Sequence, residues 1–275
     1  MKSNVETYYD QNAREEWDRL ERHQIEFQVT LRALTEFLPP TPARLIDIGG
    51  GPGRYAITLA QRGYRVTLVD LSAGNLELAR QKAAEAGVEL DGYLHANALD
   101  LSSFAAGSFD AALLLGPLYH LHKLEERQAA LQQAYRLLKP GGPVFASLIT
   151  RFAGFRDAAV HGYSFVLDDP AYSENLLATG IHDNGKGFAD AYFCHPEEVI
   201  PLGESAGFTT LRLMGCEGIL AGHEEYVNSL TGPDHDFWLD INYRMAQEAC
   251  LLGASDHLLY IGRKDSTIKS AKEKK

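Results

Sequence analysis

A run of glycines that follows an aspartate is the clearest candidate for ligand binding in this chain. The run reads Asp47-Ile48-Gly49-Gly50-Gly51-Pro52-Gly53. Glycines let the backbone turn without Cβ clashes and let a ligand lie against the main chain, and the amide end of a following helix favours a carboxylate. Asp47 can meet an ammonium group. The turn is expected to bind a small polar ligand, although a glycine turn alone does not identify that ligand.

A second acid stands at a position suited to a ribose. Asp70 ends the next apolar run, where a carboxylate can hold ribose hydroxyls. The pattern Gly51-x-Gly53-x-x-Ala56 also satisfies a dinucleotide fingerprint, so a nicotinamide dehydrogenase stays open at this point. On a purely structural interpretation, Asp70 caps the next turn and Ser72 caps a helix.

The elements that position these residues are expected to alternate between strand and helix. The predicted strands, with helical periodicity between them, are residues 45–48, 65–70, 92–96, 109–115 and 144–148. Such alternation predicts a parallel sheet with helices on both faces. Ligands bind at the carboxyl ends of the strands in such sheets, which is where Asp47 and Asp70 fall.

At these positions the sequence resembles the class I S-adenosylmethionine-dependent methyltransferases, firmly over residues 43–150 and more loosely to Arg263. The helix that follows the fourth strand ends with Leu137-Leu138-Lys139-Pro140-Gly141-Gly142, which is part of the resemblance. The resemblance implies an α/β fold with a Rossmann-like, doubly wound, seven-stranded sheet whose last strand is antiparallel. N-terminal helices and two insertions are expected to form a lid. Predicted strands at residues 209–214 and 257–261 fit the last two strands.

The resemblance also implies S-adenosyl-L-methionine as the cofactor and a role for each matching residue. Asp47 and the glycines would surround its methionine part, Asp70 would hold the ribose, Leu71 would flank the adenine, and Asn97 with the Ala98 amide would bind the adenine edge. An amide stands where the family usually has an acid, but an amide can donate and accept. The cofactor-binding residues implied are Tyr9, Asp47, Gly49, Gly51, Gly53, Asp70, Leu71, Asn97, Ala98 and Gly116.

The methyl acceptor is expected beside Gly116-Pro117-Leu118-Tyr119-His120, which follows the fourth strand. Enzymes that methylate amines of nucleic acids and of glutamine carry Asn or Asp, then Pro-Pro and an aromatic residue here, and this segment departs from that pattern. It also contains no carboxylate before Lys123, so no metal is predicted.

Histidines supply the candidates for acid–base chemistry. His120 is the catalytic candidate, either as a general base or as a residue that orients the substrate. Tyr119, His120 and His182 are the predicted substrate-binding residues. Weaker candidates are His195, His223 and Glu217. Five further histidines are assigned to the surface or to packing: His23, His122, His161, His235 and His257.

The predicted organisation has three parts. Residues 1–42 form a helical cap, with a helix over 17–38 preceded by a short one near Tyr8; residues 43–264 form the methyltransferase domain, with insertions at about 151–194 and 219–252; residues 265–275 form a flexible basic tail. The first insertion is rich in Phe and Tyr, including Phe188, which favours an apolar lid over a small molecule.

Composition narrows the partners. The 275 residues include 26 Lys and Arg against 37 Asp and Glu, a net charge of −11 at pH 7, which counts against nucleic acid. The absence of a signal peptide and of long apolar runs predicts a cytoplasmic protein with no membrane partner. We expect methyl transfer to an O or N of a small molecule. A protein or peptide methyltransferase and a non-catalytic, cofactor-binding partner subunit are the alternatives, and the oligomeric state is left unpredicted.

Overall fold

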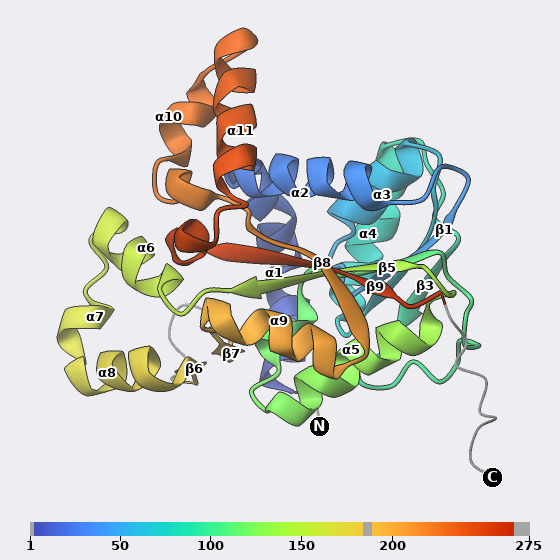
Figure 1. Cartoon of the computed structure of the whole chain (residues 1–275), viewed down its shortest axis with the longest axis horizontal. Coiled ribbons are helices and arrows are strands. Elements are labelled where there is room, and N and C mark those ends of the chain that lie inside the picture. The colour runs from blue at the N-terminus through green and yellow to red at the C-terminus, as the bar shows by residue number, and fades with distance from the viewer. Residues whose placement is uncertain (1–2, 184–188, 267–275) are drawn as a thin grey trace.

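A seven-stranded sheet forms the centre of the computed structural model, which describes residues 3–183 and 189–266 (Figure 1). Its spatial order is β3-β2-β1-β4-β5-β9-β8. The strands are β1 (Arg44–Ile48), β2 (Arg65–Asp70), β3 (Gly92–His95), β4 (Ala111–Leu114), β5 (Pro143–Ile149), β8 (Phe208–Gly215) and β9 (His257–Lys264). Only β9 runs antiparallel to its neighbours, β5 and β8, which confirms the predicted sheet.

Helices cover both faces of this sheet. On one face lie α1 (Asn4–Arg22), α2 (Gln24–Phe37), α3 (Arg54–Gln61) and α4 (Ala73–Glu85). On the other lie α5 (Leu124–Leu137) and α9 (Pro196–Ser205). Each face is sealed by its own apolar cluster, because strand residues point alternately to opposite sides. Phe145 packs on the first face, and Ala146 packs on the second.

The N-terminal helices divide at a different residue from the predicted one. The expected single helix over residues 17–38 is wrong, because Trp17 and Leu20 belong to the 19-residue α1 and the chain breaks at His23. The φ and ψ angles of His23 are −96° and 61°, outside the helical range. Arg19 and Glu26 pair across this break at 2.6 Å, so an ion pair holds the two helices at their junction.

The two insertions are mostly helical and project from the end of the sheet at which β5 terminates (Figure 1). The first contains α6 (Ala153–His161), α7 (Phe165–Asp168), α8 (Pro170–Thr179) and the short strands β6 (Ile181–His182) and β7 (Ala191–Tyr192). The second contains η2 (Gly218–Leu220), α10 (Glu224–Ser229), α11 (Pro233–Met245) and η3 (Ala249–Ala254). Phe188 and residues 267–275 of the predicted tail lie outside the described residues.

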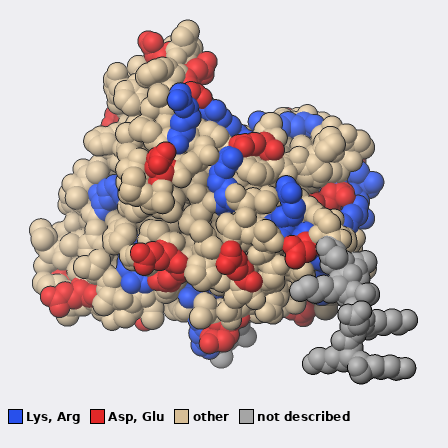
Figure 2. Space-filling model, viewed as in Figure 1, with Lys and Arg blue, Asp and Glu red and all other residues tan. Residues whose placement is uncertain are grey.

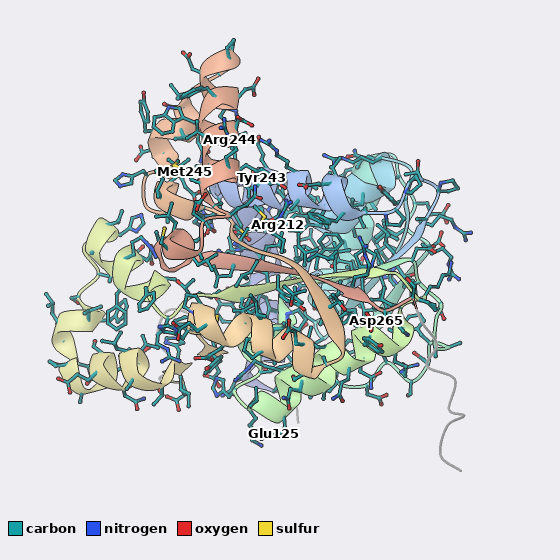
Figure 3. All side chains as sticks on the ribbon, in the orientation of Figure 1. Glu125, Arg212, Tyr243, Arg244, Met245 and Asp265 are labelled. Carbon is teal, nitrogen blue, oxygen red and sulfur yellow. The ribbon has the colours of Figure 1, made fainter. Side chains whose placement is uncertain are left out.

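A polar contact joins the second insertion to the N-terminal helices. Arg212 on β8 and Tyr243 on α11 lie side by side and both bind Glu36 on α2, at 2.7 and 2.6 Å (Figure 3). The surface around these elements carries acidic and basic side chains in alternation, with no continuous basic area on the face shown in Figure 2. No helix among residues 3–183 and 189–266 is long and apolar enough to cross a membrane.

Candidate functional site

A cavity of about 280 Å³ lies at the carboxyl ends of β1, β2 and β4. The glycine turn after β1, the inner side of α1, the loop after β3 and the 3₁₀ turn η1 (Pro117–His120) line it. Strands β1 and β4 are neighbours although β2 and β3 lie between them in sequence, so the strand order reverses beside this cavity. Open parallel sheets bind ligands at such a point.

Asp47 supplies a buried charge that nothing in the described chain neutralises. Its side chain is fully buried near the carboxyl end of β1, and neither carboxylate oxygen has a hydrogen-bond partner among the described residues. Burial raises the pKa of Asp47 to about 7, and the Asp70 carboxylate adds to the rise. A buried polar group without a partner is costly, so this carboxylate fits a ligand that brings a cation or donor to it.

The glycine turn has no room for side chains where it passes Asp47 and η1. A Cβ on Gly50 would lie 2.4 Å from Oδ2 of Asp47, and a Cβ on Gly49 would lie 2.4 Å from Cγ of Pro117. Gly49 also has φ of +66°, which L side chains rarely adopt. The backbone therefore runs directly against both walls of the cavity.

Asp70 lines the cavity and at the same time holds the turn in place. Its Oδ2 accepts the Gly51 N–H at 2.8 Å, and its Oδ1 accepts the Ser72 N–H at 2.8 Å and the Asn75 amide at 3.2 Å. Burial raises the pKa of Asp70, and these hydrogen bonds oppose the rise. Ser72 is the N-cap of α4, so the structural interpretation of Ser72 is correct.

The loop after β3 lines the cavity from the side opposite to η1, because β3 and β4 lie on opposite sides of β1 and β2 in the sheet. Leu71, Asn97 and Ala98 all line it. Asn97 is exposed, and its Oδ1 accepts the Leu99 N–H at 2.9 Å. The Nδ2 group of Asn97 is the part of this amide that can donate to a ligand.

Tyr9 and His120 meet in the wall of the cavity. The Tyr9 hydroxyl lies 2.8 Å from Nε2 of His120, and Nδ1 of His120 lies 2.9 Å from the Asp190 carbonyl oxygen. Because a carbonyl only accepts, Nδ1 carries the proton and Nε2 accepts from Tyr9. Burial lowers the pKa of His120 to about 4, so the ring is neutral at pH 7. His120 thus joins α1, η1 and the first insertion.

Most of the predicted site residues meet in this cavity. Its lining contains Tyr9, Asp47, Gly49, Gly51, Asp70, Leu71, Asn97, Ala98, Gly116, Tyr119 and His120. Two do not join them. Gly53 is instead the N-cap of α3, and His182 lies in the first insertion, where its Nδ1 bonds the Tyr172 hydroxyl.

Four charged lining residues were missed from the sequence, among them Glu126 on α5. Glu16 and Arg19 of α1 line the cavity together with Arg54 at the start of α3. The signal was present in part, because Tyr9, Glu16 and Leu20 share one face at helical spacing. Whether this face of α1 lies against the glycine turn depends on how α1 packs on the rest of the molecule, which helical spacing does not show. Arg54 stacks at 4.0 Å from the Trp17 ring and donates to the Trp17 carbonyl at 2.7 Å.

Comparison with known proteins places the chain beside methyltransferases. A family model described as a methyltransferase domain matches residues 46–146. The ubiquinone biosynthesis O-methyltransferase of Xanthomonas axonopodis pv. citri is 33% identical over 192 residues, which cover 70% of this chain and 72% of that protein. Its counterpart from Ralstonia nicotianae is 32% identical over 211 residues, which cover 76% and 77%.

A solved structure shares the fold at lower identity. The 1,6-didemethyltoxoflavin-N1-methyltransferase of Burkholderia thailandensis was solved with 1,6-didemethyltoxoflavin and S-adenosylhomocysteine bound. It superimposes with a TM-score of 0.56 at 16% identity and covers 95% of this chain and 88% of its own.

Proposed function

Because this chain belongs to the class I S-adenosylmethionine-dependent methyltransferase family, we propose that it methylates a hydroxyl oxygen of an aromatic small molecule. That it is an S-adenosylmethionine-dependent methyltransferase with a small-molecule substrate is the premise of this proposal. The finer assignment concerns the acceptor atom and the residues that bind both substrates.

The unpartnered carboxylate of Asp47 is the observation that carries the cofactor site. An amino acid ammonium group would neutralise it, with Gly49, Gly51 and Gly116 beside the methionine part. Asp70 would accept from the ribose hydroxyls, Leu71 would flank the adenine, and Asn97 with the Ala98 amide would bind the adenine edge. Tyr9 would cover the cofactor from α1.

S-adenosylmethionine supplies a methyl group on a positively charged sulfur. The protein's part is then to align the acceptor and to exclude water, which matters more than a strong acid because the transition state loses charge. We propose that Tyr119 and His120 contact the acceptor and that His120 orients it, because both ring nitrogens of His120 are already hydrogen-bonded. His182, which belongs to the first insertion, would also bind the acceptor.

An oxygen acceptor on an aromatic ring is supported by two observations. The relatives from Xanthomonas and Ralstonia are named as O-methyltransferases of ubiquinone biosynthesis. An apolar and aromatic cluster joins Tyr119 of the cavity wall and Ile149 of β5 to Phe193 of the first insertion. A flat apolar ring suits such surroundings.

Further parts of the proposal concern organisation and setting. We propose residues 1–42 as the cap, 43–264 as the catalytic domain, and residues 151–194 and 219–252 as the segments that enclose the acceptor. The net charge of −11 supports a reaction without nucleic acid. The thiols of Cys194, Cys216 and Cys250 are not paired in disulfides, which supports a cytoplasmic location.

The test is methyl transfer from labelled S-adenosylmethionine to paired phenolic and amine acceptors of the same ring size, with products identified by mass spectrometry. We expect O-methyl products and one S-adenosylhomocysteine per methyl transferred. Methylation of the amines alone would contradict the oxygen assignment. Cofactor binding without turnover on any acceptor, or turnover only on basic peptides, would favour the partner-subunit or the peptide-methyltransferase alternative.

A further inference from the structure

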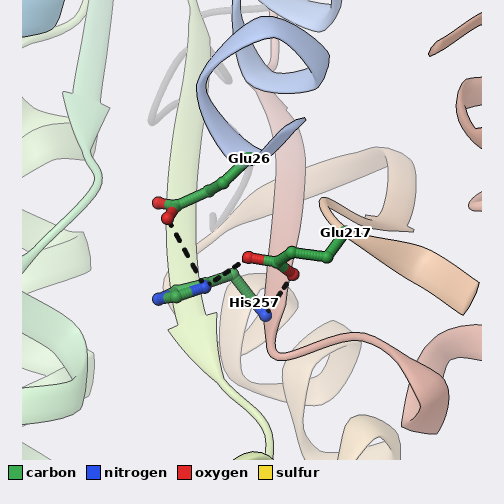
Figure 4. A group of neighbouring side chains, drawn as sticks. All are labelled: Glu26, Glu217 and His257. Carbon is green, nitrogen blue, oxygen red and sulfur yellow. Dashed lines mark hydrogen bonds and ion pairs between the residues drawn. The ribbon is translucent and has the colours of Figure 1, made fainter. Parts of the chain in front are cut away.

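Two acids and a histidine gather where α2, the end of β8 and the start of β9 meet (Figure 4). Nδ1 of His257 lies 2.6 Å from Oε1 of Glu217 and 3.7 Å from Oε2 of Glu26. The side chains of Glu217 and Glu26 are only 2% and 6% exposed, whereas that of His257 is 15% exposed. Buried carboxylates thus hold the imidazole of His257, while a small part of this side chain remains exposed.

The hydrogen bonds favour an ion network over a metal site. Arg19 donates to both oxygens of Glu26, at 2.6 and 3.3 Å. Oε2 of Glu217 accepts from a serine hydroxyl and two backbone N–H groups, and Oε1 faces Nδ1 of His257. The carboxylate oxygens therefore already have donors, and a guanidinium stands beside the place that a cation would take.

His257 is cationic in these surroundings. Burial by itself lowers its pKa, but Glu26 and Glu217 outweigh burial and raise the pKa of His257 to about 9. The same attraction lowers the pKa of Glu217 to about 2, although burial opposes it. Arg19 and Asp256 are the other charged groups near the ring. Because the proton on Nδ1 of His257 is donated to Glu217, the second proton of the imidazolium is on Nε2.

Nε2 points away from both carboxylates in Figure 4. Within residues 3–183 and 189–266, the hydrogen bond made by the His257 ring uses Nδ1 and not Nε2. The His257 ring lies 6.5 Å from the ring of Tyr119, centre to centre. Glu26 connects His257 to Arg19, which lines the cavity.

The sheet places His257 on the acceptor side of the cavity. His257 begins β9 and pairs with Ile149, the last residue of β5, so both lie at the edge where the sheet binds ligands. Strands β3 and β4 lie on opposite sides of β1 and β2, so the loop after β3 and Tyr119 after β4 line the cavity from opposite sides. His257 stands beside Tyr119 and is not itself part of the cavity lining. With the nucleoside at the loop after β3, the transferred methyl group faces Tyr119 and therefore His257.

We propose that His257, held by Glu217, donates a hydrogen bond from Nε2 to the acceptor oxygen and stabilises that oxygen as an anion. This inference rests on the proposed function, because it assigns a residue to the oxygen acceptor of the same site. His257 is then a catalytic residue, and Glu217 and Glu26 are positioning residues that act through it.

The step balances without a further reactant. The acceptor hydroxyl loses its proton to water, and the anionic oxygen remains paired with the imidazolium. A bond forms between this oxygen and the methyl carbon while the carbon–sulfur bond breaks and its electron pair stays on sulfur. The sulfur becomes neutral, the acceptor becomes a methyl ether, and His257 keeps its proton throughout.

The experiment titrates a bound phenol in place of turnover. 4-Nitrocatechol, whose visible absorption changes on ionisation, is added to the protein saturated with S-adenosylhomocysteine, and the fraction ionised is followed against pH. We expect the pH of half-ionisation to fall by about one unit or more relative to the probe in water, which is a tenfold change in the ionised-to-neutral ratio.

His257→Gln should remove this shift and leave binding of S-adenosylhomocysteine unchanged by calorimetry. His235→Gln is the matched control, because His235 has the same 15% side-chain exposure but lies on α11, away from the cavity (Figure 1). If His257→Gln does not fold, His257→Lys takes its place, since it keeps a cation beside the carboxylates. We then expect the probe to remain ionised.

The outcomes separate the two proposals. Equal ionisation of the bound probe in the wild type and in His257→Gln, or a neutral probe in the wild type or in His257→Lys, would overturn the role of His257 and leave the oxygen acceptor standing. Failure of the wild type to bind any phenol would overturn the proposed acceptor class and this role with it. A stoichiometric divalent ion lost in Glu217→Gln would also overturn it in favour of a metal site.

Discussion

At the scale of single residues, we expect Asp47 to lower the stability of the unbound protein and to favour ligand binding. In the unfolded chain a carboxyl ionises near pH 4, whereas burial raises the pKa of Asp47 to about 7 in the folded chain. The unbound folded protein therefore loses stability as pH rises from about 4 to 7, and the full penalty remains above pH 7. A bound ammonium group would offset it.

Asp47→Asn should accordingly stabilise the unbound protein at pH 8 and weaken the ligand complex. We expect a gain of about 1 kcal/mol or more in the free energy of unfolding, because a buried charge is removed, and a loss of about 2 kcal/mol or more in binding of S-adenosylhomocysteine. Urea unfolding and calorimetry measure the two. A variant that loses stability at pH 8 would contradict this account of Asp47.

The same group predicts proton release on binding. Because the ammonium group favours ionised Asp47, affinity for S-adenosylhomocysteine should rise between about pH 5 and pH 7 and then level off. Calorimetry at pH 6 in buffers of different ionisation enthalpy should show a proton released, and Asp47→Asn should release less. Equal heats across the buffers would argue against an ionising Asp47.

A change at Tyr9 can test whether His120, the predicted catalytic histidine, orients the methyl acceptor or removes its proton. Tyr9→Phe removes the hydroxyl that donates to Nε2. If His120 orients the acceptor, the KM for the acceptor should rise by about three- to tenfold, which corresponds to the loss of one hydrogen bond, and kcat should change little. Tyr8→Phe is the neighbouring control. A fall in kcat of a hundredfold or more with unchanged KM would point to proton transfer through this pair.

At the scale of elements, α1 acts as a cover tied down at several points. Asp10 accepts from the Ser72 hydroxyl at 2.6 Å and from the Gly74 N–H at 3.2 Å, which fastens α1 to the start of α4. Arg54 holds the middle of α1 through Trp17, and Arg19 holds its end through Glu26. The cavity wall formed by α1 therefore depends on contacts far apart in sequence.

Loosening this cover should weaken the cofactor complex. Asp10→Ala removes two hydrogen bonds to α4, and we expect affinity for S-adenosylhomocysteine to fall by about three- to tenfold. Faster hydrogen exchange of α1 amides should accompany the loss. Glu15→Ala, an exposed change on the same helix, is the control. Unchanged exchange and affinity in Asp10→Ala would show that α1 is held without this contact.

At the scale of the whole molecule, ligand binding should stabilise the fold as a unit, because the cavity is built from β1, β2, β4, α1 and η1 together. At one hundred times its Kd, S-adenosylhomocysteine should add about 2.7 kcal/mol and raise Tm by about 5–10 °C. A thermal scan measures this shift. NAD⁺ at the same concentration is the control and should leave Tm unchanged; an equal shift with NAD⁺ would mean that the cavity does not select its ligand.

The sequence by itself determined the features that depend on neighbouring residues. Alternating apolar runs predicted the parallel strands to within a few residues, and the glycine turn with Asp47 and Asp70 predicted one wall of the cavity. Backbone turns, strand periodicity and helix caps are local preferences, so a short window of residues contains them. The break at His23 was missed because helical periodicity continues across it.

Only the tertiary structure decided which distant side chains meet. The sequence assigns His257 to the surface or to packing, yet it stands between Glu26 and Glu217, residues separated from it by 231 and 40 positions. His182 lies against Tyr172 within the first insertion, and His120 joins Tyr9 to Asp190. Such meetings follow from how helices and insertions dock on the sheet, and docking depends on burial of whole faces that no local spacing records.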